Sequence, residues 1–262
     1  MTIHNSGIEE LPLTVRDSSL REEAEYDDGT VKTVDDTLSA FQSYLRRQKS
    51  REMRLEDGSW STSNRFVDRY AKRHYGKVAG ADRQLQHQFE DLHCVMISLS
   101  SPLHNDRGEY RPPADYLDDL LSPMQSVTDA IGYKLGESLS LDYARHWILC
   151  PNQDGSVTLK HSLWVDGDVE SADFESTVDK HLKHCPQLSR EDRQFVDVQI
   201  WEPEDGTNTD LLEMQTEDLV GWNGTLDAQR YIRRFGAVLW ARKRRQFNGG
   251  DTFQEFVRRS VQ

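Results

Sequence analysis

The feature that most constrains the fold is a pair of apolar stretches joined by a short polar turn. The stretches are YARHWILCP (143–151) and SVTLKHSLWVDG (156–167), and the residues between them are NQDG. Both stretches are rich in β-branched and aromatic side chains, and short turns containing Asn, Asp and Gly join antiparallel strands. The pair therefore predicts a β-hairpin.

The second strand of this hairpin carries a single histidine, His161, two positions after Leu159. Side chains two positions apart lie on the same face of a strand, so a His-x-His pair there would place two imidazoles side by side. Here Leu159 and Leu163 share the face of His161, and a divalent metal site usually needs at least three ligands. The residue pattern favours an ordinary strand histidine over a metal ligand, and both interpretations stay open.

Other segments predict helices and strands on both sides of the hairpin. LHCVMISLSS (92–101) is a nearly continuous apolar run typical of a buried central strand, and FVDVQIWEP (195–203) alternates like a strand. Helices are predicted over 37–55, over 63–90 with an interruption at Gly76–Gly80, over 113–139 with a kink at Pro123, and over 169–186, 211–222 and 225–245. This order predicts an α+β fold with a mostly antiparallel central sheet, flanking helices and an N-terminal helical extension.

Charge divides the chain into parts. Residues 1–36 hold ten Asp or Glu against three Arg or Lys and lack apolar periodicity, which predicts a disordered acidic arm. Residues 41–80 reverse the sign, with ten basic and four acidic residues. We therefore expect an acidic arm over 1–36, a basic helical segment over 37–90 and the α+β domain over 91–262.

The whole chain of 262 residues is acidic, with 45 Asp or Glu, 32 Lys or Arg and a net charge of −13. Abundant carboxylates with little Lys are typical of proteins that work in multimolar salt, where the Debye length shrinks to about 3 Å or less. An ordinary acidic cytosolic protein can have the same totals. Composition therefore leaves both interpretations open.

Cysteine usage indicates a reducing compartment, and hydropathy gives no sign of a membrane segment. The chain has an odd number of cysteines, Cys94, Cys150 and Cys185, and no CxxC pair, which argues against a disulfide framework and a zinc ribbon. The start of the chain lacks signal-peptide features and no apolar run approaches 18 residues, so we expect a cytoplasmic protein without a membrane segment. P-loop, dinucleotide-binding and common hydrolase motifs are absent from the sequence.

The sharpest local charge is the run RYIRRFGAVLWARKRR (230–245), which has seven basic residues and no acidic one. Cations beside Tyr231 and Phe247 fit phosphate contacts with stacking on bases, which favours nucleic acid as the partner over a merely solvated helix face. Tyr231 is also a candidate nucleophile for a phosphodiester, although an ordinary amphipathic tyrosine is the commoner case. The predicted DNA-binding residues are Arg230, Arg233, Arg234, Arg242, Lys243, Arg244 and Arg245.

A further cluster, KHLKHCP (180–186), holds His181, His184 and Cys185. His181 and Cys185 are four residues apart and share a helix face, so the pair could clamp zinc. The alternative is a helix end, where the dipole favours His and Lys. The helix end is preferred because no second Cys or His pair occurs at zinc-finger spacing.

Four blocks, taken in order, resemble the replication initiator (Rep) proteins of haloarchaeal plasmids and small haloarchaeal viruses, a branch of the rolling-circle HUH endonucleases. The similarity runs from about Asn64 to Phe253 through RYAKRHYGKVAGADRQLQHQFEDLHCVMISLSS, RPPADYLDDLLSPMQSV, HWILCPNQDGSVTLKHSLWVDGDVESADFESTVDKHLKHCP and LDAQRYIRRFGAVLWARKRRQF. The resemblance implies a sheet on which two histidines hold Mg²⁺ or Mn²⁺, and a tyrosine that attacks the scissile phosphate of DNA.

The chain departs from that pattern at two places. His161 matches the second histidine of the implied metal pair, whereas the first falls on Leu159. The tyrosine is expected within 211–222, where the candidate positions hold Met214 and Asp218, and the nearest downstream tyrosine is Tyr231. We therefore expect a Rep-like protein that binds origin DNA, single-stranded or hairpin, with metal-dependent nicking reduced, altered or lost.

Two alternatives remain beside this expectation. A non-catalytic regulator of copy number or transcription would bind duplex DNA on the same fold without a metal. A protein–protein scaffold would have no nucleic-acid role.

Overall fold

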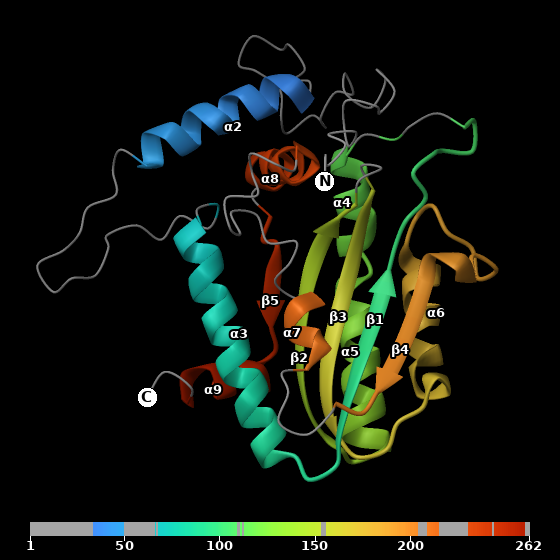
Figure 1. Cartoon of the computed structure of the whole chain (residues 1–262). Helices are drawn as coiled ribbons and strands as arrows, with labels where there is room; N and C mark the ends of the chain where they lie inside the picture. Colours follow the sequence, from blue (N-terminus) through green and yellow to red (C-terminus); the bar gives the residue numbers. More distant parts are fainter. Residues whose placement is uncertain are drawn as a thin grey trace, which may run out of the picture.

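The computed structural model describes residues 34–49, 66, 68–108, 111, 113–152, 156–203, 209–214, 230–242 and 244–259. Within them, five strands form one antiparallel sheet in the order β4-β1-β3-β2-β5 (Figure 1). They are β1 (Leu92–Leu99), β2 (Asp142–Pro151), β3 (Val157–Asp166), β4 (Val196–Trp201) and β5 (Phe247–Gly249). The predicted α+β class is confirmed. The hairpin is also confirmed, and in it Trp147 lies opposite His161.

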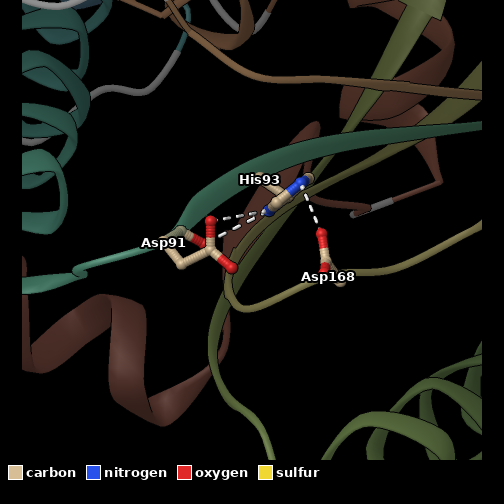
Figure 2. Close-up of side chains that lie close together, drawn as sticks. All are labelled: Asp91, His93 and Asp168. Atoms are coloured by element: carbon tan, nitrogen blue, oxygen red, sulfur yellow. Dashed lines mark hydrogen bonds and ion pairs between the residues drawn. The ribbon is translucent and has the colours of Figure 1, made fainter.

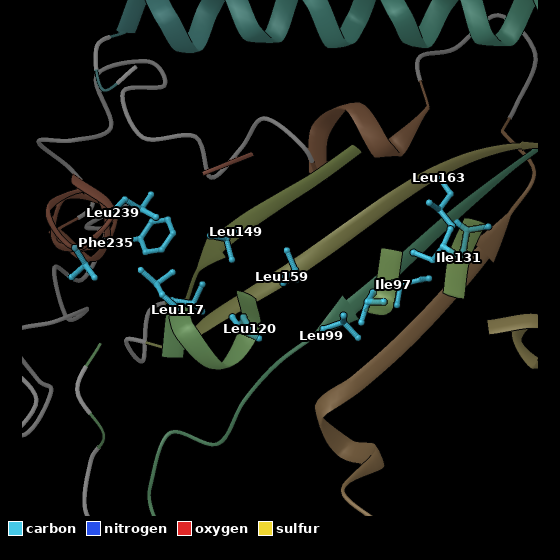
Figure 3. Packing of buried hydrophobic residues seen from close by; sticks show 14 of the residues in the cluster. Ile97, Leu99, Leu117, Leu120, Ile131, Leu149, Leu159, Leu163, Phe235 and Leu239 are labelled. Atoms are coloured by element: carbon cyan, nitrogen blue, oxygen red, sulfur yellow. The ribbon is translucent and has the colours of Figure 1, made fainter. Parts of the chain in front are cut away.

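One face of the sheet is covered by α4 (Pro113–Leu121), α5 (Met124–Gly132) and α6 (Glu175–His184). Strand side chains alternate, so every second residue of β1 and β3 points to this face. The buried cluster there includes Ile97, Leu99, Leu117, Leu120, Ile131, Leu159 and Leu163 (Figure 3).

The same core is extended by α8 (Arg230–Ala241), through Phe235 and Leu239, and by α2 (Val34–Lys49). In Figure 1, α2 runs across the end of the molecule where α8 lies, and the ring centroids of Phe41 and Trp240 are 5.8 Å apart. The N-terminal helix therefore packs with the α+β domain.

The other face is covered by α3 (Asp68–Gln88), α7 (Asp210–Met214) and α9 (Asp251–Arg259). Ala71, Val78 and Leu85 are buried at intervals of seven residues, which places them on one side of α3. The helix continues without a break through Gly76 and Gly80, so the predicted interruption is wrong. Packing of the buried side outweighs the roughly 1 kcal/mol that a glycine costs within a helix.

Pro123 separates two helices where the sequence predicted a kink. α4 ends at Leu121, and α5 begins at Met124 with Pro123 as its N-cap residue. Proline disfavours a helical conformation in the residue before it, which explains the break. The carbonyl of Pro123 then accepts a 2.9 Å hydrogen bond from the amide of Val127, which starts the new helix.

Two elements, β5 and α9, lie beyond the last predicted element. α9 carries the buried side chains Phe253, Phe256 and Val257 at helical spacing, and β5 pairs with β2. Residues 1–33 of the predicted arm, and 215–222 of a predicted helix, lie outside the described residues. None of the described helices has the length and apolar character that a membrane crossing needs.

Candidate functional site

His161, the predicted metal ligand, lies in the core on the sheet face that α4, α5 and α6 cover. Its side chain is completely buried, and neither ring nitrogen has a hydrogen-bond partner among the described residues. Burial, with the positive charge of nearby Arg145 and smaller contributions from His181 and His146, lowers the pKa of His161 to about 3. The ring is therefore neutral at neutral pH.

The surroundings of His161 do not fit a divalent cation. Leu159 and Leu163, its neighbours on the same face of β3, are fully buried and offer no ligand atom. The guanidinium of Arg145 opposes a second positive charge nearby. In the part of the chain that the structure describes, His161 belongs to no group of three potential metal ligands. Its metal role stays a prediction, without a second ligand.

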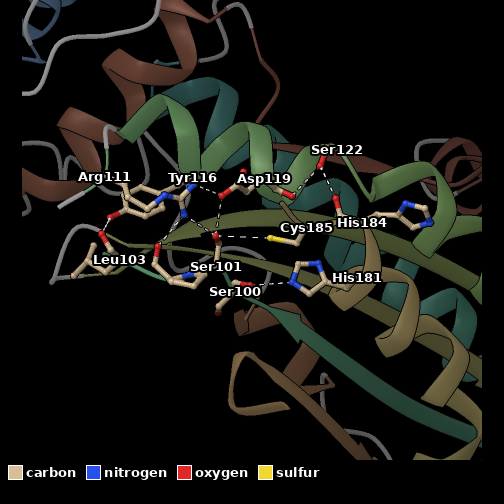
Figure 4. Close-up of polar contacts among 11 residues, drawn as sticks. Ser100, Ser101, Leu103, Arg111, Tyr116, Asp119, Ser122, His181, His184 and Cys185 are labelled. Carbon is tan, nitrogen blue, oxygen red and sulfur yellow. Dashed lines mark hydrogen bonds and ion pairs between the residues drawn. The ribbon is translucent and has the colours of Figure 1, made fainter. Parts of the chain in front are cut away.

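His181 and Cys185 fasten α6 to the chain that leaves β1 (Figure 4). Nε2 of His181 lies 2.9 Å from the carbonyl oxygen of Ser100, and the Cys185 thiol lies 3.8 Å from the Ser101 hydroxyl. Burial lowers the pKa of His181 and raises the pKa of Cys185. A neutral imidazole and a protonated thiol with these contacts support the helix-end interpretation over a zinc clamp.

Ser101 also belongs to a buried polar network with Arg111 and Asp119 (Figure 4). The Ser101 hydroxyl donates to Oδ2 of Asp119 at 3.0 Å and accepts from Nη1 of Arg111 at 3.0 Å, and Arg111 forms an ion pair with Asp119. These groups bond to one another, so the network holds the loop after β1 against α4.

Of the predicted DNA-binding residues, the structure describes the side chains of three. The side chain of Arg242 is 8% exposed, and its Nη2 lies 2.9 Å from Oδ2 of the partly buried Asp118 on α4, so a carboxylate of the protein already holds this guanidinium. Arg244 and Arg245 are exposed, and Nη2 of Arg244 lies 3.8 Å from Oδ1 of the same Asp118. Tyr231, Arg230, Arg233 and Arg234 lie in α8 with side chains outside the described set, and Lys243 is outside it altogether.

The solvent side of α3 is basic. Lys72, Arg73 and Lys77 are exposed, whereas the acidic Asp82 of the same helix is fully buried. These three residues come from the 41–80 segment in which the sequence shows its positive balance. We refer to Lys72, Arg73, Lys77, Arg244 and Arg245 as the basic surface.

Aromatic contacts join the two parts of the basic surface. The ring of Phe247, two residues after Arg245, stacks against Tyr70 and His74 of α3 at centroid distances of 6.0 and 3.5 Å. Burial, together with His146 and Lys77, lowers the pKa of His74, so its ring packs as a neutral group. Figure 1 shows α3 alongside β5, the strand that begins two residues after Arg245.

A cluster that the sequence did not reveal lies where β1 begins, at the end of the strand opposite to Ser100 and Ser101. Asp91, His93 and Asp168 each offer one potential metal-binding atom, and these atoms lie within 4.8 Å of one another (Figure 2). The residues are brought together because Leu92 of β1 pairs with Asp166 of β3. Nothing in the local sequence around either segment signals this, since the register of the two strands creates the cluster.

The fold and the described side chains define a class: an α+β protein whose antiparallel sheet carries a basic helix and stacked aromatic rings on one face. Comparison with known proteins then gives the family. The chain belongs to the family described as "Putative rep protein (DUF1424)", whose model matches residues 14–210.

Two relatives come from halophilic archaea. One is an "Uncharacterized 36 kDa protein" of Halobacterium salinarum, 27% identical over 267 residues that cover 91% of this chain and 81% of the relative. The other has the same description, in Halobacterium sp. (strain GN101), and is 28% identical over 167 residues covering 60% of this chain and 51% of the relative. No solved structure matches the chain.

Proposed function

We propose that the protein is a DNA-binding, replication-initiator-like protein of a haloarchaeal plasmid or virus. Membership of the Rep family carries this proposal. The relatives of this chain in Halobacterium support the interpretation that its acidic composition is an adaptation to high salt. The family supports DNA as the partner, and we propose single-stranded or hairpin origin DNA as its form.

The basic surface supports DNA binding in a chain of net charge −13. Lys72, Arg73 and Lys77 are exposed on one helix, and Arg244 and Arg245 are exposed on the segment that leads into β5, so five cations are available for contacts with phosphates. Tyr70 and Phe247 stack on each other and are only partly buried, which would give the bases of a single strand aromatic rings on which to stack.

Binding to DNA should depend on this surface and on salt. The test compares the triple variant Lys72→Ala, Arg73→Ala, Lys77→Ala with wild type in fluorescence anisotropy across a KCl series, on single-stranded, hairpin and duplex DNA. Loss of three phosphate contacts should reduce the slope of log K against log[salt] by roughly 2 to 3. Circular dichroism at each salt concentration checks that both proteins are folded.

A matched control removes the same charge elsewhere. Lys180, Lys183 and Arg190 are exposed on α6 and the turn after it, a helix that covers the opposite face of the sheet. Their triple alanine variant should bind DNA like wild type. Equal loss in both variants would overturn the assignment of the basic surface, and absence of DNA binding by wild type would overturn the function and favour a protein–protein scaffold.

Strand cleavage is a separate question. The burial of His161 favours a second candidate, a non-catalytic DNA-binding regulator on the same fold. Labelled single-stranded DNA incubated with Mn²⁺ or Mg²⁺ tests it. A covalent protein–DNA band that disappears in Tyr231→Phe would establish nicking with Tyr231 as nucleophile. Binding without a band in wild type would support the regulator.

A further inference from the structure

His93 enters a group of carboxylates at the end of the sheet where β1 begins and β3 and β4 end. Nε2 of His93 lies 3.4 Å from Oδ1 of Asp168 and 3.7 Å from Oε1 of Glu202, and its Nδ1 lies 3.8 Å from Oδ1 of Asp91. The three carboxylates are exposed, whereas the imidazole is only 8% exposed. Figure 2 shows the ring of His93 between Asp91 and Asp168.

Backbone contacts hold the start of β1 against the turn that follows β3. The amide of Asp91 donates to the carboxylate of Asp166 at 2.9 Å, and the amide of Gly167 donates to the carbonyl of Asp91 at 2.8 Å. Gly167 has a φ of +132°, a conformation that L side chains rarely adopt. This turn places Asp168 next to His93 immediately after the strand ends.

The hydrogen bond of Nδ1 determines which ring nitrogen faces the carboxylates. Nδ1 lies 3.2 Å from the backbone carbonyl of Asp91, and a carbonyl can only accept, so Nδ1 is the nitrogen that carries hydrogen. In the neutral ring, Nε2 then presents its lone pair to two carboxylate oxygens. Metal-binding histidines commonly donate their other N–H to a carbonyl or carboxylate in this way.

The distances fit ligands around a cation better than direct hydrogen bonds. A charge-assisted N–H···O bond is typically about 2.7 to 2.9 Å long, shorter than either contact of Nε2. Two ligand atoms, each about 2.1 Å from a metal at a tetrahedral angle, lie roughly 3.4 Å apart. Nε2 of a largely buried imidazole thus faces two carboxylate oxygens, and a positive ion among them would relieve their mutual repulsion.

We propose that Asp91, His93 and Asp168, with Glu202 beside them, form a site for a divalent transition-metal ion. One imidazole with carboxylates is a ligand set for Mn²⁺ or Zn²⁺ rather than for Mg²⁺, which prefers oxygen alone. The ion would join the ends of β1, β3 and β4. This site is distinct from His161 and does not depend on the proposed DNA binding.

The test is a titration of metal-stripped full-length protein with Mn²⁺ in molar KCl, with free Mn²⁺ measured by electron paramagnetic resonance. Wild type should bind one Mn²⁺ per chain, and Asp168→Asn should weaken binding by about tenfold or more. Glu202→Gln should also weaken it. Both carboxylates are largely exposed, so these variants should fold, and thermal unfolding checks that they do.

Two controls separate this site from others. Asp197→Asn, a carboxylate on the exposed part of β4, and His161→Leu should both bind Mn²⁺ like wild type. Zn²⁺ should displace Mn²⁺ while the same concentration of Mg²⁺ should not. No binding by wild type, undiminished binding by Asp168→Asn, loss in His161→Leu, or equal displacement by Mg²⁺ would each overturn the proposal.

Discussion

The indole nitrogen of Trp164 donates a 2.8 Å hydrogen bond to Oδ1 of Asp82, and both side chains are fully buried. Asp82 also accepts from the hydroxyl and the amide of Thr209, and from Nε2 of Gln86 at 2.9 Å. One carboxylate therefore connects α3 to the central strand β3 and to the start of α7. It fixes the helix that carries much of the basic surface.

We expect Asp82→Asn to lower the free energy of unfolding by about 3 kcal/mol, because the amide group of Asn would face donors that need an acceptor in a buried site. Chemical denaturation in molar KCl measures the loss. Glu90→Gln, an exposed carboxylate just after α3, is the matched control and should change stability little. A stability close to wild type for Asp82→Asn would contradict the anchoring role.

Stability should fall in mild acid because of His161. The pKa of its ring is about 3 in the native protein and roughly 6.5 in an unfolded chain, so the unfolded chain binds the extra proton as pH falls below 6.5. This residue alone should cost about 2 kcal/mol of stability between pH 7 and pH 5. His74 and His181, whose pKa values are also lowered by burial, act in the same direction.

His161→Leu isolates this contribution. Leucine is apolar like the neighbouring Leu159 and Leu163, so the variant should fold. Between pH 7 and pH 5 its free energy of unfolding, measured with denaturant, should fall by about 2 kcal/mol less than that of wild type. The remaining histidines leave a residual pH dependence in the variant. If the free energies of unfolding of the two proteins fell in parallel with pH, the pKa of His161 would not be lowered in the native protein.

Leu159→His tests the metal strand that the Rep resemblance implies. Leu159 is completely buried in the same cluster as Leu99, Leu120 and Leu149. We expect the variant to lose about 2 to 3 kcal/mol of stability, because an imidazole without partners enters an apolar core, and to gain no affinity for Mn²⁺. Tighter Mn²⁺ binding by the variant would support the implied histidine pair instead.

Substitutions of Arg242 and Arg245 should have different effects although both residues belong to the basic run 230–245. The first should lower stability and the second should lower DNA affinity. Arg242→Ala leaves the partly buried Asp118 without its closest cation and should cost about 1 to 3 kcal/mol in thermal or chemical unfolding. Arg245→Ala removes an exposed cation, so stability should hold while DNA affinity falls. A destabilised Arg245→Ala, or a fully stable Arg242→Ala, would reverse these roles.

The local periodicity of the sequence predicted the hairpin, the buried strand β1 and the sheet class, because burial of alternating residues imposes a visible pattern. It could not show that Arg242 turns inward, since its partner Asp118 is 124 residues earlier in the chain. The three-residue β5 is defined by its pairing with β2, about 100 residues earlier, which its own short sequence does not reveal. The cluster of Asp91, His93 and Asp168 likewise depends on strand register, which no single segment encodes.

The positions of α3 and α9 on one face of the sheet determine when α3 can reach its native position during synthesis. α9 packs against α3 through Phe256, which lies at a ring distance of 6.2 Å from Phe89, just after α3. On the ribosome, α3 emerges before the five strands of the described sheet, yet part of its buried side can be covered only when residues 251–259 have left the exit tunnel. Native seating of this helix therefore has to wait until residues 251–259 have emerged, and nascent chains that end before α9 should not display the basic side of α3 in its native position.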